Sequence, residues 1–243
     1  MSRPRGLIPA LALGGALALA GLPASANESQ RYEVYLGGLK AGDMQLEAQE
    51  SGSSYSVRGR MQPGGVLGYM VKFLFQGQAQ GGLTGAGSVR PARYEGKSQT
   101  RGRNNNVLIE FGPNAPRNVV LNPKPKPRPY RLDPTAQRNV VDPLSTAYDA
   151  LRARPRGQIC NRSWTVFDGL KTSRVTLSRP RQESGAVLCD GSLSRVGGYS
   201  PKDMAEAKSF PFTIHYVDAG DGTMKVSKFV TRSIFGTIVA HRR

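Results

Sequence analysis

Alternation of apolar and polar residues with a period of two is the feature that most limits the fold. From Arg31 the chain reads "RYEVYLGGLKAGDMQLEA", which places Tyr32, Val34 and Leu36 on one face of an extended segment before a Gly-rich turn. Turn signals recur about every 8–12 residues, a spacing typical of antiparallel sandwiches and barrels. We therefore predict a mainly β fold, with residues 27–243 as a single large antiparallel β-barrel or open half-barrel of about 12–14 strands.

The second half of the chain shows the same alternation between turn signals. Asp168-Gly169 and Asp221-Gly222 each separate two apolar runs. Asp-Gly predicts a tight hairpin in which both central residues adopt positive φ. Asp168 is therefore interpreted as a turn residue and not as a catalytic acid. The strands predicted here are 159–167, 170–179, 186–196, 211–218, 223–232 and 236–241.

Residues 143–153 are the clearest exception to the strand pattern. In "DPLSTAYDALRARPRG" Asp142 suits the N-cap and Pro143 the first helical position. Arg152 and Arg154 fall near the carboxyl end, where cations complement the helix dipole. A helix is therefore expected, with an apolar face formed by Leu144, Ala147, Tyr148 and Leu151.

A second, short helical segment is expected within "GGVLGYMVKFLF", residues 64–75, where Val66, Leu67 and Met70 have helical spacing. The alternative is one continuous apolar strand. Such a segment suits either a flap over a cavity or an ordinary plug of a barrel.

A basic, proline-rich connector is predicted at about 112–135. Four prolines, at positions 123, 125, 127 and 129, alternate with Lys124, Lys126 and Arg128. This composition favours extended polyproline II and cannot form a core. We favour a solvated connector between two halves of the sheet, and the alternative is a basic arm for an anionic surface.

Residues 1–26 have the form of a secretory signal peptide. A basic start with Arg3 and Arg5 precedes a 16-residue apolar run and a small-residue site ending at Ala26. A membrane anchor is the alternative, but the run is short and interrupted by glycines. We expect cleavage after Ala26, export to the periplasm, and no transmembrane segment in the mature chain.

The net charge of +17 restricts the partners. In a cytosolic protein it would indicate nucleic acid. In an exported protein it indicates envelope lipids, lipopolysaccharide or cell-wall polymers, and no nucleic acid. The alternative is charge spread over the surface for solubility.

Cys160 and Cys189 are the two cysteines of the chain. An even number in an exported protein predicts a disulfide. A metal site would need two further ligands, and the histidines, His215 and His241, lie far away in the sequence. No metal or cofactor is expected.

The sequence contains no serine-hydrolase elbow and no phosphate-binding loop. We therefore assign no catalytic residue and expect no enzyme activity. A hydrolase would require converging acids or a Ser–His pair that includes His215. Trp164 and Tyr199 are candidate ligand-binding residues together with the basic side chains of the connector, although aromatic residues in strands more often belong to the core.

Five phrases in order resemble domain-of-unknown-function family 3108 of proteobacteria: "YEVYLGGLKAGDMQLEA", "VRPARYEG", "VVDPLSTAYDALR", "VFDGLKTSRVTL" and "CDGSLSRVGGYSPKD". The layout is more loosely similar to alphaproteobacterial envelope-integrity proteins with a spiral-like β-barrel. The resemblance implies a periplasmic β-barrel-like domain with a role in envelope maintenance, and it implies no catalytic residues.

The expected function is therefore non-enzymatic envelope maintenance, with a lipid or another amphiphilic or anionic envelope component bound in or on the barrel. The first alternative is a scaffold that binds the cell wall or another periplasmic or outer-membrane protein. The second is a hydrolase of envelope polymers.

Overall fold

The computed structural model describes residues 25–68, 73–100, 102–233 and 236–243. A 14-stranded antiparallel sheet dominates this part of the chain, which confirms the predicted fold class. Its strands are β1 (Ser25–Leu36), β2 (Leu39–Ser51), β3 (Ser54–Pro63), β4 (Leu74–Leu83), β5 (Val89–Thr100), β6 (Arg103–Phe111), β7 (Pro116–Asn122), β8 (Arg154–Pro155), β9 (Arg162–Phe167), β10 (Thr172–Glu183), β11 (Ala186–Gly197), β12 (Ser209–Asp218), β13 (Thr223–Ser233) and β14 (Gly236–Arg242).

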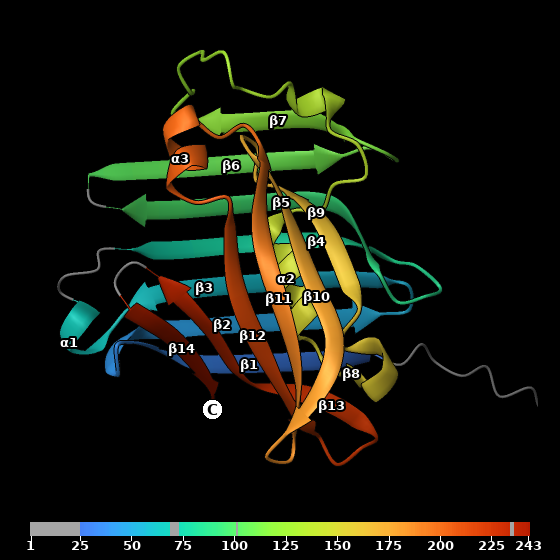
Figure 1. Ribbon diagram of the computed structural model, residues 1–243. Coiled ribbons are helices and arrows are strands. Elements are labelled where there is room, and N and C mark those ends of the chain that lie inside the picture. Colours follow the sequence, from blue (N-terminus) through green and yellow to red (C-terminus); the bar gives the residue numbers. More distant parts are fainter. Residues whose placement is uncertain (1–24, 69–72, 101, 234–235) are drawn as a thin grey trace, which may run out of the picture.

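The sheet is open and has the first and last strands at its centre. Its order runs from β7 back to β1, then from β14 back to β9, with β8 paired to β13 outside this path. The pairing of β1 with β14 joins the two halves, in a register that runs from Tyr32 opposite Arg242 to Leu36 opposite Ile238. In Figure 1 the halves form two crossing layers, β1–β7 in blue to green and β9–β14 in orange to red, with α2 between them.

Helix α2 (Pro143–Leu151) is the predicted helix, and it ends two residues before the predicted boundary. The Asp142 side chain accepts a hydrogen bond from the Ser145 N–H at 2.8 Å, as expected of an N-cap. Arg152 has an extended backbone with ψ of 154°, so the chain leaves the helix there. Arg152 and Arg154 therefore follow the helix, whereas the sequence placed them inside its carboxyl end, and both side chains are buried.

The α2 helix fills the middle of the space between the layers. Leu144 lies so close to β3 that a Cβ on Gly59 would be 2.6 Å from its Cδ1 atom. The Tyr148 ring stacks on Tyr55 with centroids 5.5 Å apart. The centre of the half-barrel is therefore packed by side chains.

Other helical segments are short. The second predicted helix is present as α1 (Gly65–Gly68), and Met70 lies outside the described residues. Helix α3 (Pro201–Glu206) was not predicted, although Ser200 and Asp203 form a capping box at its start. Single 3₁₀ turns occur at η1 (Pro134–Ala136) and η2 (Arg156–Gln158).

The predicted connector at 112–135 is too long at its amino end, because it includes strand β7. Val119 pairs with Ile109 and Leu121 with Val107 in the neighbouring strand. Prolines occupy only the first position of β7 and the position after it, where the sheet tolerates them. The part without regular structure begins at Pro123, and it leads from the edge strand β7 toward α2.

The predicted signal peptide lies almost entirely outside the described residues. Strand β1 begins at Ser25, and its first pairs are Ser25 with Ser51 and Ala26 with Glu50. Cleavage after Ala26 would therefore remove two residues from β1. Among the described residues, no helix is long and apolar enough to cross a membrane.

Candidate functional site

A buried carboxylate at the end of α2 organises the interior. Asp149 has no exposed surface, and its two oxygens accept bonds from Arg152, Arg154 and Arg162. Trp164 donates its indole N–H to Asp149 Oδ2 at 2.9 Å. The Arg162 guanidinium also lies over the Trp164 ring, 4.8 Å from its centroid. A charge buried with this many partners is costly to assemble, and such clusters are common at functional sites.

A second acid extends this network toward the surface. Glu50 Oε1, from β2, accepts bonds from the Tyr148 hydroxyl and from Arg152 Nη1. Arg152 and Arg154 also donate to the carbonyl oxygen of Gly87. We call Glu50, Asp149, Arg152, Arg154 and Arg162 the interior ion network.

The carbonyl groups at the end of α2 are bonded by side chains from both layers. Arg162 donates to the Asp149 carbonyl at 2.8 Å, and the Tyr216 hydroxyl to that of Ala150 at 2.8 Å. Gln30 donates to the Leu151 carbonyl at 3.1 Å. The negative end of the helix dipole is thus satisfied inside the protein.

Burial shifts the titration of several groups around α2. Desolvation lowers the pKa of Arg154 to about 10 despite the attraction of Asp149, so this guanidinium remains charged at neutral pH. Desolvation also lowers the pKa of Arg162. At the other end of α2, burial raises the pKa of Asp142 to about 6, although the hydrogen bonds from Ser145 act to lower it.

A small cavity lies between the β9–β10 turn and the inner face of β4–β7. Its volume is about 230 Å³, and we call it the turn cavity. Its apolar wall comes from four strands and the β9–β10 turn, and the remaining lining residues are Gly96, Ser98, Pro123, Asp168 and three asparagines. The apolar lining residues include Phe75, Tyr94, Val107, Leu121 and Leu170.

The Asp168-Gly169 turn closes one side of this cavity, but it is not the predicted two-residue hairpin. Phe167 pairs with Thr172, so four residues form the loop. Gly169 has a positive φ of 95°, whereas Asp168 is not among the positive-φ residues. The Asp168 carboxylate instead accepts the N–H groups of Leu170 at 2.8 Å and Lys171 at 2.7 Å. The second Asp-Gly loop likewise has four residues, with positive φ at Gly220 and Gly222 but not at Asp221.

We expect Asp168→Ala to lower the free energy of unfolding by about 1–2 kcal/mol, because two turn N–H groups lose their acceptor. Asp168→Asn keeps a side-chain oxygen in the same place and should change the stability by less than about 0.5 kcal/mol. Urea denaturation of both variants checks this. Equal losses in the two variants would mean that the turn bonds are not the cause.

The candidate binding residues from the sequence are divided among separate places. Trp164 is buried against Asp149. Tyr199 is half-buried, bonds Ser173 through its hydroxyl at 2.6 Å and contacts Lys171 and Arg195 through its ring. The three connector cations, Lys124, Lys126 and Arg128, are exposed.

The connector nevertheless lies next to the turn cavity at one end and close to Tyr199 at the other. Pro123, which lines the turn cavity, directly precedes Lys124. Near the other end of the connector, Leu132 packs on Gly197, two residues before Tyr199. We call residues 123–131 the basic arm.

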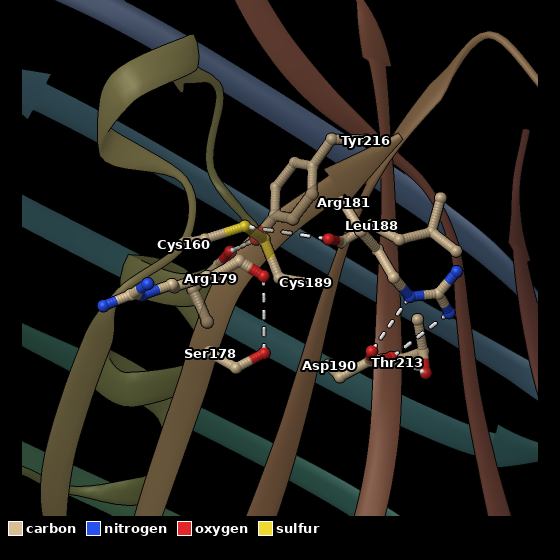
Figure 2. Close-up of a disulfide and its surroundings, with 10 residues drawn as sticks. Cys160, Ser178, Arg179, Arg181, Leu188, Cys189, Asp190, Thr213 and Tyr216 are labelled. Carbon is tan, nitrogen blue, oxygen red and sulfur yellow. Dashed lines mark hydrogen bonds and ion pairs between the residues drawn. A yellow bond between two sulfur atoms is a disulfide. The ribbon is translucent and has the colours of Figure 1, made fainter. Parts of the chain in front are cut away.

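The predicted disulfide between Cys160 and Cys189 is confirmed. It links the segment before β9 to β11, with β10 between these strands in the sheet order. Figure 2 shows the bond beside Tyr216, with Asp190 farther along β11 held by Arg181 and Thr213. Cys189 is fully buried.

A hydrolase site at His215 would need a serine hydroxyl bonded to the His215 imidazole. No such bond is seen in the part of the chain that the structure describes. The Ser227 hydroxyl donates at 3.2 Å to the backbone carbonyl of His215 and not to its imidazole. Among the described residues, no three His, Cys, Asp or Glu side chains are grouped to hold a metal ion.

Sequence reasoning missed the interior ion network. The available signal was Asp149, which immediately follows Tyr148 of the predicted apolar helix face and precedes two arginines. Glu50 in β2 and Arg162 in β9 gave no comparable signal in the sequence, because their contacts with the α2 region form only when the chain folds.

Comparison with known proteins decides the family. The model of a protein family of unknown function, DUF3108, matches residues 31–185, more than half of the chain. The chain belongs to the DUF3108 family. This confirms the resemblance to the family. The match contains the first four of the five phrases, within residues 32–177, and the fifth, residues 189–203, lies beyond it.

No curated protein matches this DUF3108 chain. The chain is similar to the crystal structure of a beta-barrel-like protein of the domain of unknown function DUF1849 from Brucella abortus. The two share 11% sequence identity over 91% of this chain and 96% of that chain, with a TM-score of 0.45.

Proposed function

We propose that the protein is a non-enzymatic envelope protein that binds an anionic amphiphile at the turn cavity and the basic arm. One observation supports this most directly. The cavity has a wall of apolar residues, and its lining residue Pro123 begins a segment with three cations in alternate positions. An amphiphile needs an apolar site for its chain beside a positive site for its head.

The geometry limits how much of the amphiphile is enclosed. A volume of about 230 Å³ is below the range of roughly 300–1,000 Å³ for sites that enclose a whole drug-sized ligand. The centre of the half-barrel is filled by α2, so the chain of a lipid does not extend into it. We therefore propose that the cavity holds one segment of an acyl chain, and that the rest of the molecule lies along the surface.

The distribution of charge favours a head group bound at the basic arm. No acidic residue occurs between Gly112 and Leu132, whereas Lys124, Lys126 and Arg128 are all exposed. The carboxylate of Asp168, which also lines the cavity, repels an anion, although its oxygen is bonded to the turn. Each basic residue near an anionic lipid contributes about 1 kcal/mol to binding.

Binding of 11-(dansylamino)undecanoic acid, followed by its fluorescence, tests both parts of the site. Lys124→Gln/Lys126→Gln/Arg128→Gln should weaken binding at least about tenfold and reduce its salt dependence. Val107→Trp, which fills the cavity, should weaken binding while the arm remains unchanged. Circular dichroism and the melting temperature establish that each variant is folded.

A matched control removes the same charge elsewhere. Arg90, Arg156 and Arg179 are exposed and lie outside the turn cavity. The triple Gln variant of these residues should bind the probe within about twofold of wild type. Equal weakening of probe binding by both triple variants would mean that net charge alone causes the effect. Unchanged binding by Val107→Trp would mean that the turn cavity does not bind the probe.

A scaffold for another envelope protein is the second candidate function, and the filled centre of the half-barrel favours it. In that case the wild-type protein would not bind the acyl probe. It would instead retain one envelope protein in a pull-down from the native envelope.

A further inference from the structure

A second pocket lies at the end of α2, away from the residues of the turn cavity. It has a volume of about 380 Å³ and is formed by the beginning of β1, the end of β2, the end of α2, the β12–β13 turn, β13 and the end of β14. We call it the α2-end pocket. Its charged or phenolic lining residues are Glu28, Glu50, Tyr148, Arg152, Asp221, Lys225 and Arg242.

The acids of this pocket are already bonded within the protein. Glu50 Oε1 accepts from Tyr148 and Arg152. The Glu28 oxygens accept from Gln30 at 2.8 Å and from the Ala153 N–H at 3.4 Å, and Arg242 lies 3.5 Å away. Asp221 accepts the N–H of Thr223 at 2.9 Å. These carboxylates are thus engaged in holding the walls of the pocket together.

The cations carry more donors than the protein satisfies. Arg152 Nε and Arg242 Nη1 are buried nitrogens without a hydrogen-bond partner. The Arg152 side chain is only 9% exposed and that of Arg242 only 17%. Unpaired buried donors of charged groups are costly, so an acceptor that reaches these side chains would be favourable.

The pocket lining by itself carries three carboxylates and three cations, and an excess of positive charge arises when the adjoining interior ion network is counted with it. The pocket lining and the interior ion network together contain four carboxylates and five cations. The carboxylates belong to Glu28, Glu50, Asp149 and Asp221, and the cations to Arg152, Arg154, Arg162, Lys225 and Arg242. The carbonyl groups at the end of α2 do not reverse this balance, because Arg162, Tyr216 and Gln30 already bond them.

We propose that the α2-end pocket binds a small oxyanion, a phosphate or carboxylate group, through Arg242 and Arg152. A small rotation of the Arg242 guanidinium would offer its unpaired N–H to a ligand oxygen, in the paired geometry that suits phosphate and carboxylate. Lys225, which also lines the pocket, adds a further positive charge. The site is independent of the turn cavity, since the two share no lining residue.

The arginines at positions 242 and 243 provide a matched pair for the test. Arg243 is next in the chain but is 66% exposed and pairs with Glu33, which does not line the pocket. Inorganic phosphate, added at constant ionic strength against chloride, should raise the melting temperature of wild type and of Arg243→Gln. Calorimetric affinity for phosphate should fall at least tenfold in Arg242→Gln.

Further variants and ligands distinguish lost phosphate binding from a folding defect and identify the source of the anion. Lys225→Gln leaves the Glu28–Arg242 pair in place, so it should weaken phosphate binding without lowering stability. Val107→Trp should leave phosphate binding unchanged, which separates this site from the proposed amphiphile site.

Binding of phosphatidylglycerol vesicles that Arg242→Gln abolishes would identify a lipid head group, whereas phosphate binding alone would identify a free anion. No phosphate effect beyond that of chloride, or equal binding by Arg242→Gln and Arg243→Gln, would overturn the proposal.

Discussion

Asp149→Ala should lower the free energy of unfolding by about 3–5 kcal/mol. The carboxylate lies at the end of α2 with no exposed surface, and three guanidiniums and one indole N–H point at it. Its removal leaves Arg154 and Arg162 buried without their shared counter-charge. Urea denaturation followed by far-UV circular dichroism measures the loss.

Two further variants isolate the cause. Asp149→Asn keeps the shape of the side chain but removes the charge, so it should also cost several kcal/mol. Glu206→Ala changes an exposed acid in α3 and should cost less than about 0.5 kcal/mol. If Asp149→Asn is as stable as wild type, the buried ion network does not hold α2 in the half-barrel.

Loss of the disulfide is the second large effect. Replacing Cys160 and Cys189 by serine should lower the free energy of unfolding by about 3–4 kcal/mol, because the bond closes a loop with a sequence separation of 29. The bond also holds the segment before β9 against β11, so exchange of the β9 amides should become faster. Denaturation with and without reductant measures the first effect, and hydrogen exchange the second.

The double-serine variant supplies the control, since reductant should not change its stability. Thiol titration of denatured, unreduced wild-type protein should find no free thiol. Two free thiols per chain would show that the bond does not form in the protein as isolated.

The strand pattern was largely readable from the sequence, because side-chain alternation follows directly from a pleated backbone with one face buried. The six strands predicted in the second half correspond to β9–β14. The partners joined by the two Asp-Gly turns were also readable, as β9 with β10 and β12 with β13, but the long-range pairing was not. Pairing of β1 with β14 joins Tyr32 to Arg242, and such long-range pairing depends on how the whole sheet coils.

Helix α2 was predictable because Asp142 and Pro143 are strong local start signals. Its carboxyl end was not, since the chain leaves the helix at Arg152 to form bonds with Glu50 and Gly87. Strand β7 was hidden among prolines for a similar reason. Its residues read as connector until β6 supplies hydrogen-bond partners.

The candidate site, too, was predictable from the sequence only in part. The cations of the basic arm, Lys124, Lys126 and Arg128, are evident in the sequence. The cavity next to them is lined by residues that are distant in the chain, with Leu170 of the β9–β10 turn facing it together with Val107 and Leu121. Trp164 was identified as a candidate ligand residue, yet its indole N–H is bonded to Asp149 in the interior.

Mass spectrometry of lipids retained by the native protein tests the central proposal most directly. Wild-type protein, exported by a Gram-negative host and purified without detergent, should retain an anionic acyl species. The Val107→Trp variant and the triple Gln variant of the basic arm should lose it, while the Arg90, Arg156 and Arg179 control keeps it. Wild-type protein free of lipid, or the same lipid retained by every variant, would contradict amphiphile binding at the turn cavity and the basic arm.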